Sequence, residues 1–198
     1  MNRSLLITLG VVGGAVLILG LIFGGTYNSL VQGEERVSEA WAQVENVYQR
    51  RLDLVPNLVE TVKGYASHER ETLEAVVEAR SKISQLNLSP KTITDPQALA
   101  GFEAAQQGLS AALSRLLVLV ERYPDLKANQ NFLTLQSQLE GTENRIAVER
   151  MRFNEAARSF NTQVRVFPNN FVAVWLGFQR KAYFAADEAA RVAPTVKF

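Results

Sequence analysis

Cysteine is absent from this chain, and histidine occurs once, at His68. Without cysteine the protein has no disulfide, no thiol nucleophile and no sulfur that could carry a lipid, and its redox compartment is left open. The single histidine excludes two kinds of metal site. A di-metal bundle needs two Glu-x-x-His pairs, and an H-E-x-x-H zinc site needs a second histidine, which His68-Glu69-Arg70-Glu71-Thr72 lacks. We therefore expect no metal and no other cofactor.

The chain also lacks an excess of charge. It has 21 Lys and Arg against 20 Asp and Glu, and Arg3 is the only charged side chain before Tyr27. A nucleic-acid interface needs a basic patch or stripe, so we expect no nucleic-acid partner. No G-x-x-x-x-G-K-[ST] phosphate loop and no His–Ser–Asp arrangement is visible. The sequence therefore offers no catalytic residue, and we expect a protein that is not an enzyme.

What the chain does contain is a long apolar run at residues 5–23, LLITLGVVGGAVLILGLIF. A helix of this length spans roughly the 30 Å hydrocarbon core of a bilayer, because each residue adds about 1.5 Å. A cleaved signal peptide has a shorter run followed by a small-residue site, whereas this run ends at Phe23-Gly24-Gly25. We interpret residues 1–26 as a retained transmembrane anchor and residues 27–198 as one helical-bundle domain, with Gly24-Gly25 as a hinge.

Glycines follow a regular spacing inside this anchor. Gly10 and Gly14, and likewise Gly20 and Gly24, are four residues apart, the spacing that lets two helix backbones approach closely in lipid. Gly13 shares one helix face with Gly20 and Gly24. We expect this face to pack anchors together and the full chain to be a homo-oligomer. The alternative is that glycine is simply common in membrane helices.

The orientation of the anchor in the membrane depends on a few charged residues near its two ends. Arg3 and the amino terminus flank one end of the anchor, and Arg36 lies near the other, while Glu34 and Glu35 count little in the positive-inside rule. The rule favours an inside N-terminus and an outward-facing domain. We therefore expect an extracytoplasmic bundle.

Beyond the anchor, apolar residues recur at spacings of three and four, which predicts amphipathic helices and no strand. The expected helices cover residues 29–64, starting at Ser29 and bending at Pro56, then residues 67–86 with Ser67 as N-cap, 95–123 starting at Asp95-Pro96, and 127–166. A polar loop with Pro90 at 87–94 and an aromatic tail with a short helix ending near Gly177 and running on to Phe198 complete the chain. The predicted fold is all-α: a transmembrane helix followed by an up-and-down antiparallel four-helix bundle with long helices. In the alternative, residues 29–86 form one bent helix.

Some polar residues occupy apolar positions of these helices. Arg51 and Glu149 stand in the apolar rows of their helices, and so do Gln106, Thr142 and Gln163. Buried charges need partners, and in an antiparallel bundle the fourth helix brings carboxylates to the level of Arg51. We expect a core network of Arg51, Glu143 and Glu149, in which one of the two carboxylates pairs with Arg51. The remaining charges considered for such a network are Glu69, Glu121 and Arg145.

Several motifs in one order resemble those of the LemA family. In the first half they are Asn28, Val37, Trp41, Arg51-Leu52-Asp53-Leu54-Val55-Pro56-Asn57-Leu58-Val59, Gly64-Tyr65 and His68-Glu69. In the second half they are Glu121-Arg122-Tyr123-Pro124-Asp125-Leu126-Lys127, Leu139-Glu140-Gly141-Thr142-Glu143-Asn144-Arg145-Ile146, Arg150, Arg152-Phe153-Asn154 and Phe167-Pro168. Phe160-Asn161 departs mildly from the Tyr-Asn pair that is frequent there. The resemblance covers residues 27–184.

The resemblance implies a bacterial membrane protein with a helical-bundle domain, and a magnetosome-formation protein in that family suggests work in membrane organisation. It transfers no catalytic residue. We expect a single-pass, membrane-anchored scaffold or adaptor that self-assembles and serves membrane or envelope organisation. Its expected partners are the lipid bilayer, further copies of itself and another membrane protein. The alternative is a helical-bundle enzyme or small-ligand-binding domain that uses the core charges.

Overall fold

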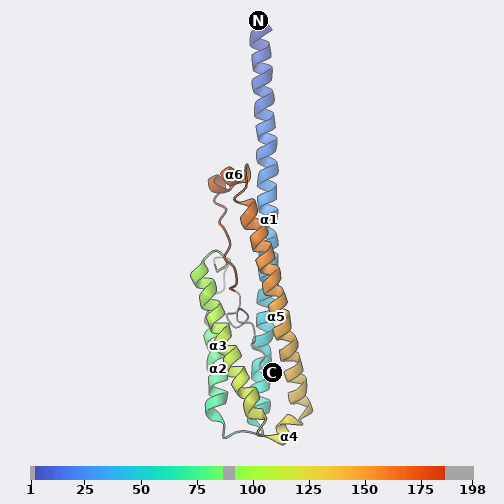
Figure 1. Ribbon diagram of the computed structural model, residues 1–198, viewed down its shortest axis with the longest axis vertical. Coiled ribbons are helices and arrows are strands. Elements are labelled where there is room, and N and C mark those ends of the chain that lie inside the picture. The colour runs from blue at the N-terminus through green and yellow to red at the C-terminus, as the bar shows by residue number, and fades with distance from the viewer. Residues whose placement is uncertain (1–2, 87–91, 186–198) are drawn as a thin grey trace, which may run out of the picture.

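The computed structural model describes residues 3–86 and 92–185, and within these residues the chain forms helices and no strand (Figure 1). The helices are α1 (Arg3–Lys63), α2 (Arg70–Ser84), α3 (Pro96–Val120), α4 (Pro124–Lys127), α5 (Gln130–Gln163) and α6 (Asn169–Leu176). The predicted all-α class with a long apolar N-terminal helix is confirmed. Pro90 and Phe198, which the sequence placed in a loop and in the aromatic tail, lie outside the described residues.

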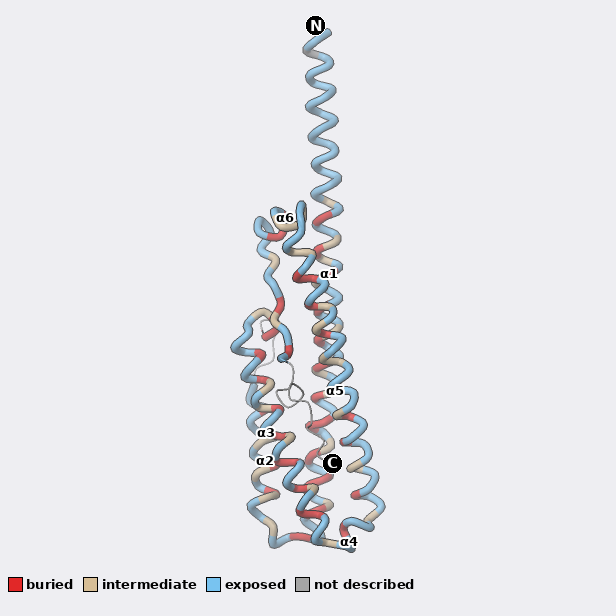
Figure 2. Tube along the Cα trace, in the orientation of Figure 1, coloured by how far each residue is buried: buried red, intermediate tan, exposed pale blue. Residues whose placement is uncertain are grey.

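α1 is one uninterrupted helix of 61 residues, about 90 Å long at 1.5 Å per residue. Its first third projects alone from the molecule with its side chains exposed, and the rest packs into the bundle (Figure 2). The expected hinge at Gly24-Gly25 and the expected helix start at Ser29 are therefore wrong. A glycine costs a helix only about 1 kcal/mol relative to alanine, which is too little to interrupt strongly helical sequence on both sides.

The long helices alternate in direction: the chain runs down α1, up α2, down α3 and up α5 (Figure 1). α1 packs most extensively against α5, and α2 packs against α3. The alternative with one bent helix over residues 29–86 is wrong, because α1 ends at Lys63 and the chain turns before α2 begins. The short helix α4 lies at the end of the bundle farthest from the N-terminus, and α6 lies at the opposite end beside α1 (Figure 1).

Helix boundaries follow local chemistry in most places. At the start of α3 the Asp95 side chain accepts a hydrogen bond from the Gln97 backbone N–H at 2.9 Å, with Pro96 in the first turn, as predicted. α6 ends at Gly177, whose φ of 76° is the left-handed conformation that closes helices. α2 begins later than expected, because its N-cap is Glu69 and not Ser67.

α1 passes through Pro56 without a loop, as predicted. Proline removes the backbone donor that would reach the carbonyl of Leu52, four residues earlier. The guanidinium of Arg80 on α2 replaces it and donates from Nε to the Leu52 carbonyl at 3.0 Å. The neighbouring helix thus satisfies the backbone group that proline leaves free.

The interior contains two large apolar cores and a small third cluster of Leu30, Val172 and Ala173 between α1 and α6. The distal core, far from the N-terminus, combines α1, α2, α3 and α5 through residues such as Val55, Val62, Val76, Leu109, Leu116, Phe132 and Leu139. The proximal core, nearer the N-terminus, contains Val37, Trp41, Val44, Tyr48, Leu99, Phe102, Ile146, Phe153, Phe160 and Phe184. Trp41 is its centre, with ring centroids of Phe102, Phe153 and Phe184 within 6.0 Å.

The chain after α6 returns along the bundle without regular structure, over residues 178–185. Two asparagines of α5 hold it by its backbone. Asn161 accepts from the Lys181 N–H at 2.7 Å and donates to the Lys181 carbonyl at 2.8 Å, and Asn154 makes the same pair of bonds with Phe184 at 2.9 and 3.1 Å. This extended segment places the Phe184 ring in the proximal core.

Candidate functional site

A layer of polar side chains separates the two cores at one level of the bundle. On α1 it is Arg51, between Tyr48 of the proximal core and Leu52 of the distal core. On α3 it is Gln106, and on α5 it is Thr142 with Glu143. Arg51, Gln106 and Thr142 are only 2%, 4% and 1% exposed. Arg51 contacts Gln106 and Glu143 here, so polar residues of three helices meet in one place.

Arg51 is the hub of this layer. Its Nε lies 2.9 Å from Glu143 Oε1, an ion pair whose atoms are not aligned as a hydrogen bond. Nη1 donates to Gln106 Oε1 at 3.5 Å, and Nη2 donates to the Ser110 hydroxyl. The layer therefore links α1 to both α3 and α5. It leaves the buried Gln106 amide N–H without an acceptor among the described residues.

A second ion pair lies beside the first. Arg150 of α5 pairs with Glu103 of α3, and it also donates to the Ala185 carbonyl at 3.0 Å. Between the two ion pairs is a cavity of about 310 Å³, lined by Tyr48, Arg51, Glu103, Gln106, Gln107, Ser110, Glu143, Ile146, Ala147 and Arg150. Two arginines face two glutamates, so the walls are charge-balanced.

The titration behaviour of these groups suits a structural or binding role. Burial raises the pKa of the Tyr48 phenol, which the nearby arginines only partly oppose, so Tyr48 stays protonated at neutral pH. Burial also lowers the pKa of the Arg51 guanidinium, and the Glu143 carboxylate opposes this shift. Arginine remains a cation in proteins, so Arg51 does not act as a base. The cavity offers donors and acceptors to a small polar molecule, without an activated nucleophile among its lining residues.

The predicted network residues do not all gather here. The structure brings Arg51 and Glu143 together, whereas Glu149 pairs with Arg152 on its own helix at 2.7 Å, outside the layer. Glu69 accepts from the Tyr123 hydroxyl at 2.9 Å, and Glu121 pairs with Lys127, both at the distal end. Arg145 is exposed on α5.

Sequence reasoning missed Glu103, Arg150, Ser110 and Tyr48 as parts of this group. None of the first three stands in the centre of an apolar row, and they meet only because α3 and α5 pack on either side of α1. One signal was available. Arg51, Gln106 and Thr142 were each visible as polar interruptions, and the antiparallel order of the helices aligns them.

Gly13 and Gly20 lie on the exposed part of α1, and the half-buried Gly24 lies where α6 begins to cover the helix. A Cβ built at Gly13, Gly20 or Gly24 would meet no atom within 4 Å. Within the described residues, α1 is the one helix long and apolar enough to cross a membrane; its best window has a mean hydropathy of 2.6, and none of that window is buried. A single apolar helix at the N-terminus is compatible with a membrane anchor.

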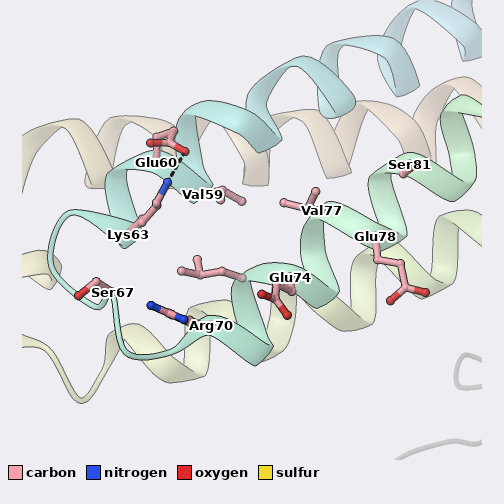
Figure 3. A pocket seen from close by; sticks show the side chains of 10 residues that line it. Val59, Glu60, Lys63, Ser67, Arg70, Glu74, Val77, Glu78 and Ser81 are labelled. Carbon is pink, nitrogen blue, oxygen red and sulfur yellow. Dashed lines mark hydrogen bonds and ion pairs between the residues drawn. The ribbon is translucent and has the colours of Figure 1, made fainter.

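A groove opens at the distal end between the last turns of α1 and most of the length of α2, from Arg70 to Ser81 (Figure 3). It has a volume of about 760 Å³. Val59 and Val77 line it, and the charged side chains Lys63, Arg70 and Glu74 surround it (Figure 3). Lys63 pairs with Glu60 across its α1 side at 3.4 Å. The groove is a shallow surface feature at the opposite end from the anchor, and the described residues hold no cluster of three His, Asp or Glu side chains that could bind a metal.

Comparison with known proteins places these features in a family. The model of the LemA family matches residues 40–198. A protein named Protein LemA from Metamycoplasma hominis is 27% identical over 89% of this chain and 78% of its own length. Magnetosome protein MamQ from Magnetospirillum gryphiswaldense is 30% identical over 80% of this chain and 64% of its length. Magnetosome protein MamQ 2 from Paramagnetospirillum magneticum is 29% identical, over 82% of this chain and 66% of its length, so the chain spans just under two thirds of both magnetosome proteins. None of these names denotes an enzyme.

Proposed function

We propose, from the premise that this chain belongs to the LemA family, that it is a single-pass membrane scaffold that self-assembles and organises the membrane around it. In this proposal the protein has no catalytic activity, and residues 1–26 are the anchor of the domain formed by residues 27–198. The names of the magnetosome relatives support a role for this protein at a membrane.

One observation carries the proposal: α1 is a single helix that leaves its apolar first third uncovered and builds the rest into the bundle core. Large apolar side chains on this lone part are exposed, for example Leu9 at 59% and Leu21 at 70%. Soluble proteins rarely expose so large an apolar surface to water, whereas a helix that crosses a bilayer exposes such a surface to lipid. The anchor and the bundle then share one rigid element.

Self-assembly follows from the chemistry of the lone segment. Lipid tails are as apolar as leucine, so helices associate in a bilayer through close packing and not through hydrophobic burial. Gly13, Gly20 and Gly24 present one face free of side chains, and none of residues 3–86 and 92–185 fills it. A self-complementary face of this kind leads to closed symmetric oligomers. The partner on the glycine face would be a second copy of this chain or another membrane protein.

Native mass spectrometry of the full chain in mild detergent tests the proposal. We expect a discrete homo-oligomer for the wild type and a shift towards monomer in Gly20→Ile and Gly24→Ile, because the isoleucine side chain separates the backbones. Ala15→Ile, on the opposite face of the same helix, is the matched control and should leave the oligomer intact.

A monomeric wild type would contradict self-assembly. An oligomer that neither glycine substitution disrupts would mean that the interface lies in the bundle and not on the glycine face.

A specific observation favours a second function, binding of a small polar molecule in the cavity of the polar layer. The Gln106 amide nitrogen is buried there without a partner in the described part of the chain, beside two ion pairs that leave the walls neutral. An uncharged ligand with a hydrogen-bond acceptor would suit this site. The mass of the extracted protein under native conditions should then exceed its denatured mass by that of one bound molecule. Gln106→Leu should lose this extra mass, whereas the control Gln43→Leu, at an exposed position of α1, should keep it. Equal masses in the wild type would favour the scaffold alone.

A further inference from the structure

α6 leaves large apolar side chains uncovered at the end of the bundle where the lone part of α1 begins (Figure 2). Phe171, Val174 and Trp175 are 66%, 84% and 75% exposed and recur at spacings of three and one, so they share one side of the helix. Phe167, just before α6, is 79% exposed, and its ring packs on that of Phe171 at 6.0 Å. The helix NNFVAVWL carries no charge.

The other side of α6 is fixed to α1. Val172 and Ala173 are buried against Leu30. The Trp175 ring lies 5.5 Å from that of Phe23, and Tyr27 lies 6.4 Å from Phe178, which follows α6. α6 therefore has a defined height along α1, at the last residues of the apolar run.

That height coincides with the edge of the bilayer. The apolar run up to Phe23 rises about 1.5 Å per residue and is only just as long as the roughly 30 Å hydrocarbon core, so a span needs all of it. Phe23 then lies at the boundary, and Trp175, in contact with it, lies at the same depth. Tryptophan and tyrosine gather at this level of membrane proteins, because their rings are apolar and their N–H or O–H is polar.

We propose that α6, with Phe167, lies in the interface of the bilayer as a second membrane contact, its exposed apolar side covered by lipid. The inference rests on the proposed membrane anchor, since it uses the depth that the anchor sets. Arg165, which is exposed and lines a hollow of about 600 Å³ together with Phe171 and Trp175, would reach the phosphates of the headgroups. The contact restricts how the bundle rotates about the axis of α1, which a lone span would leave free.

The two tryptophans of the chain make this measurable without labels. Trp41 is 5% exposed in the proximal core and lies roughly 27 Å along α1 beyond Phe23, out of reach of the lipid. We would reconstitute the full chain in phosphatidylcholine vesicles whose acyl chains carry bromine near the carbonyl or near the terminal methyl. We expect Trp175 to be quenched more strongly by the shallow bromines, and Trp175→Phe to remove this quenching.

A charge on the lipid-facing side should pull α6 out of the interface. Val174→Asp should reduce the bromine quenching at least twofold and raise the quenching by aqueous iodide, whereas Val118→Asp, at a valine of α3 that is 71% exposed, should change neither. Circular dichroism of both variants checks that the bundle stays folded.

Flotation of the vesicles separates this inference from the anchor itself. Wild-type chain that floats, with Trp175 quenched by iodide and not by bromine, would overturn the interfacial placement and leave the anchor standing. Trp175 shielded from both quenchers would mean that protein, such as a second copy, covers α6, and would also overturn it. A chain that fails to float would overturn the anchor and this inference together.

Discussion

At the scale of single residues, Arg51 shows what a buried charge requires. Its side chain is 2% exposed and is satisfied only by contributions from two other helices, Glu143 on one side and Gln106 with Ser110 on the other. An interaction of this kind is a poor source of net stability, but it is costly to break and it penalises helices that slip out of register. The polar layer therefore fixes how α1, α3 and α5 align.

We predict that Arg51→Ala lowers the free energy of unfolding by about 1–3 kcal/mol, because it leaves the buried Gln106 amide without its partner, whereas Glu143 is 41% exposed and water can solvate it. Urea unfolding of the full chain in mild detergent, followed by circular dichroism, measures the change. Arg145→Ala, on the exposed side of α5, is the matched control and should change stability by less than about 0.5 kcal/mol. An unaltered melt for Arg51→Ala would show that Arg51 is solvated.

The residues that sequence reasoning could identify were those that break a pattern. Arg51 and Gln106 interrupt apolar rows, so their burial in a polar layer was open to prediction, and so was a carboxylate partner on α5. Glu103 and Arg150 break no pattern, because each flanks its row, and they become half-buried only where they pair with each other between α3 and α5. Asn154 and Asn161 bind the backbone of the extended segment, and no side-chain pattern records such a partner.

At the scale of elements, strong local signals set helix boundaries at the predicted residues, whereas weak ones did not. Asp95-Pro96 and Gly177 act within one turn, so their effect could be read directly. Gly24-Gly25 and Ser29 wrongly predicted a hinge and a helix start. Helix propagation is cooperative, so a residue of low helix propensity interrupts a helix only when the flanking residues also have low propensity. Gly33 has a role that only packing shows: a Cβ there would lie 2.2 Å from Gln163 Oε1, so glycine lets α5 approach α1.

Pro56 and Arg80 form a pair that a double-mutant cycle can resolve. We predict that Pro56→Ala keeps the helical content, because α1 already continues through this position and alanine restores a donor to the Leu52 carbonyl. Arg80→Ala alone should cost about 1–3 kcal/mol, since it leaves that carbonyl without a partner. In the Pro56→Ala background the same change should cost clearly less.

Urea midpoints of the four proteins give the coupling energy, and circular dichroism gives the helical content. Additive effects would show that Arg80 does not compensate for the proline. A loss of helix in Pro56→Ala would mean that the proline itself holds the conformation of α1.

At the scale of the whole molecule, the absence of cysteine permits a direct test of orientation. We predict that Glu74→Cys, exposed near the distal groove, reacts with a membrane-impermeant maleimide added to intact spheroplasts, because the positive-inside rule places the bundle outside. Ser4→Cys, at the other end of α1, should react only after lysis. Both residues are exposed on α-helices, so each is the control for the other.

The reverse labelling pattern would place the bundle in the cytoplasm. It would also move α6 to the inner leaflet without changing its depth.

The continuity of α1 also has a mechanical consequence. With residues 1–26 in the membrane as proposed, residues 26–63 would form a strut that carries the distal groove about 55 Å above the bilayer, with no break in the helix between the lipid and the tip. A tilt of the span by roughly 10° would swing that tip sideways by about 10 Å, and a rotation of the span would turn the groove through the same angle. Changes in bilayer thickness, which tilt a span of fixed length, would thus be amplified into displacements at the far end of the molecule.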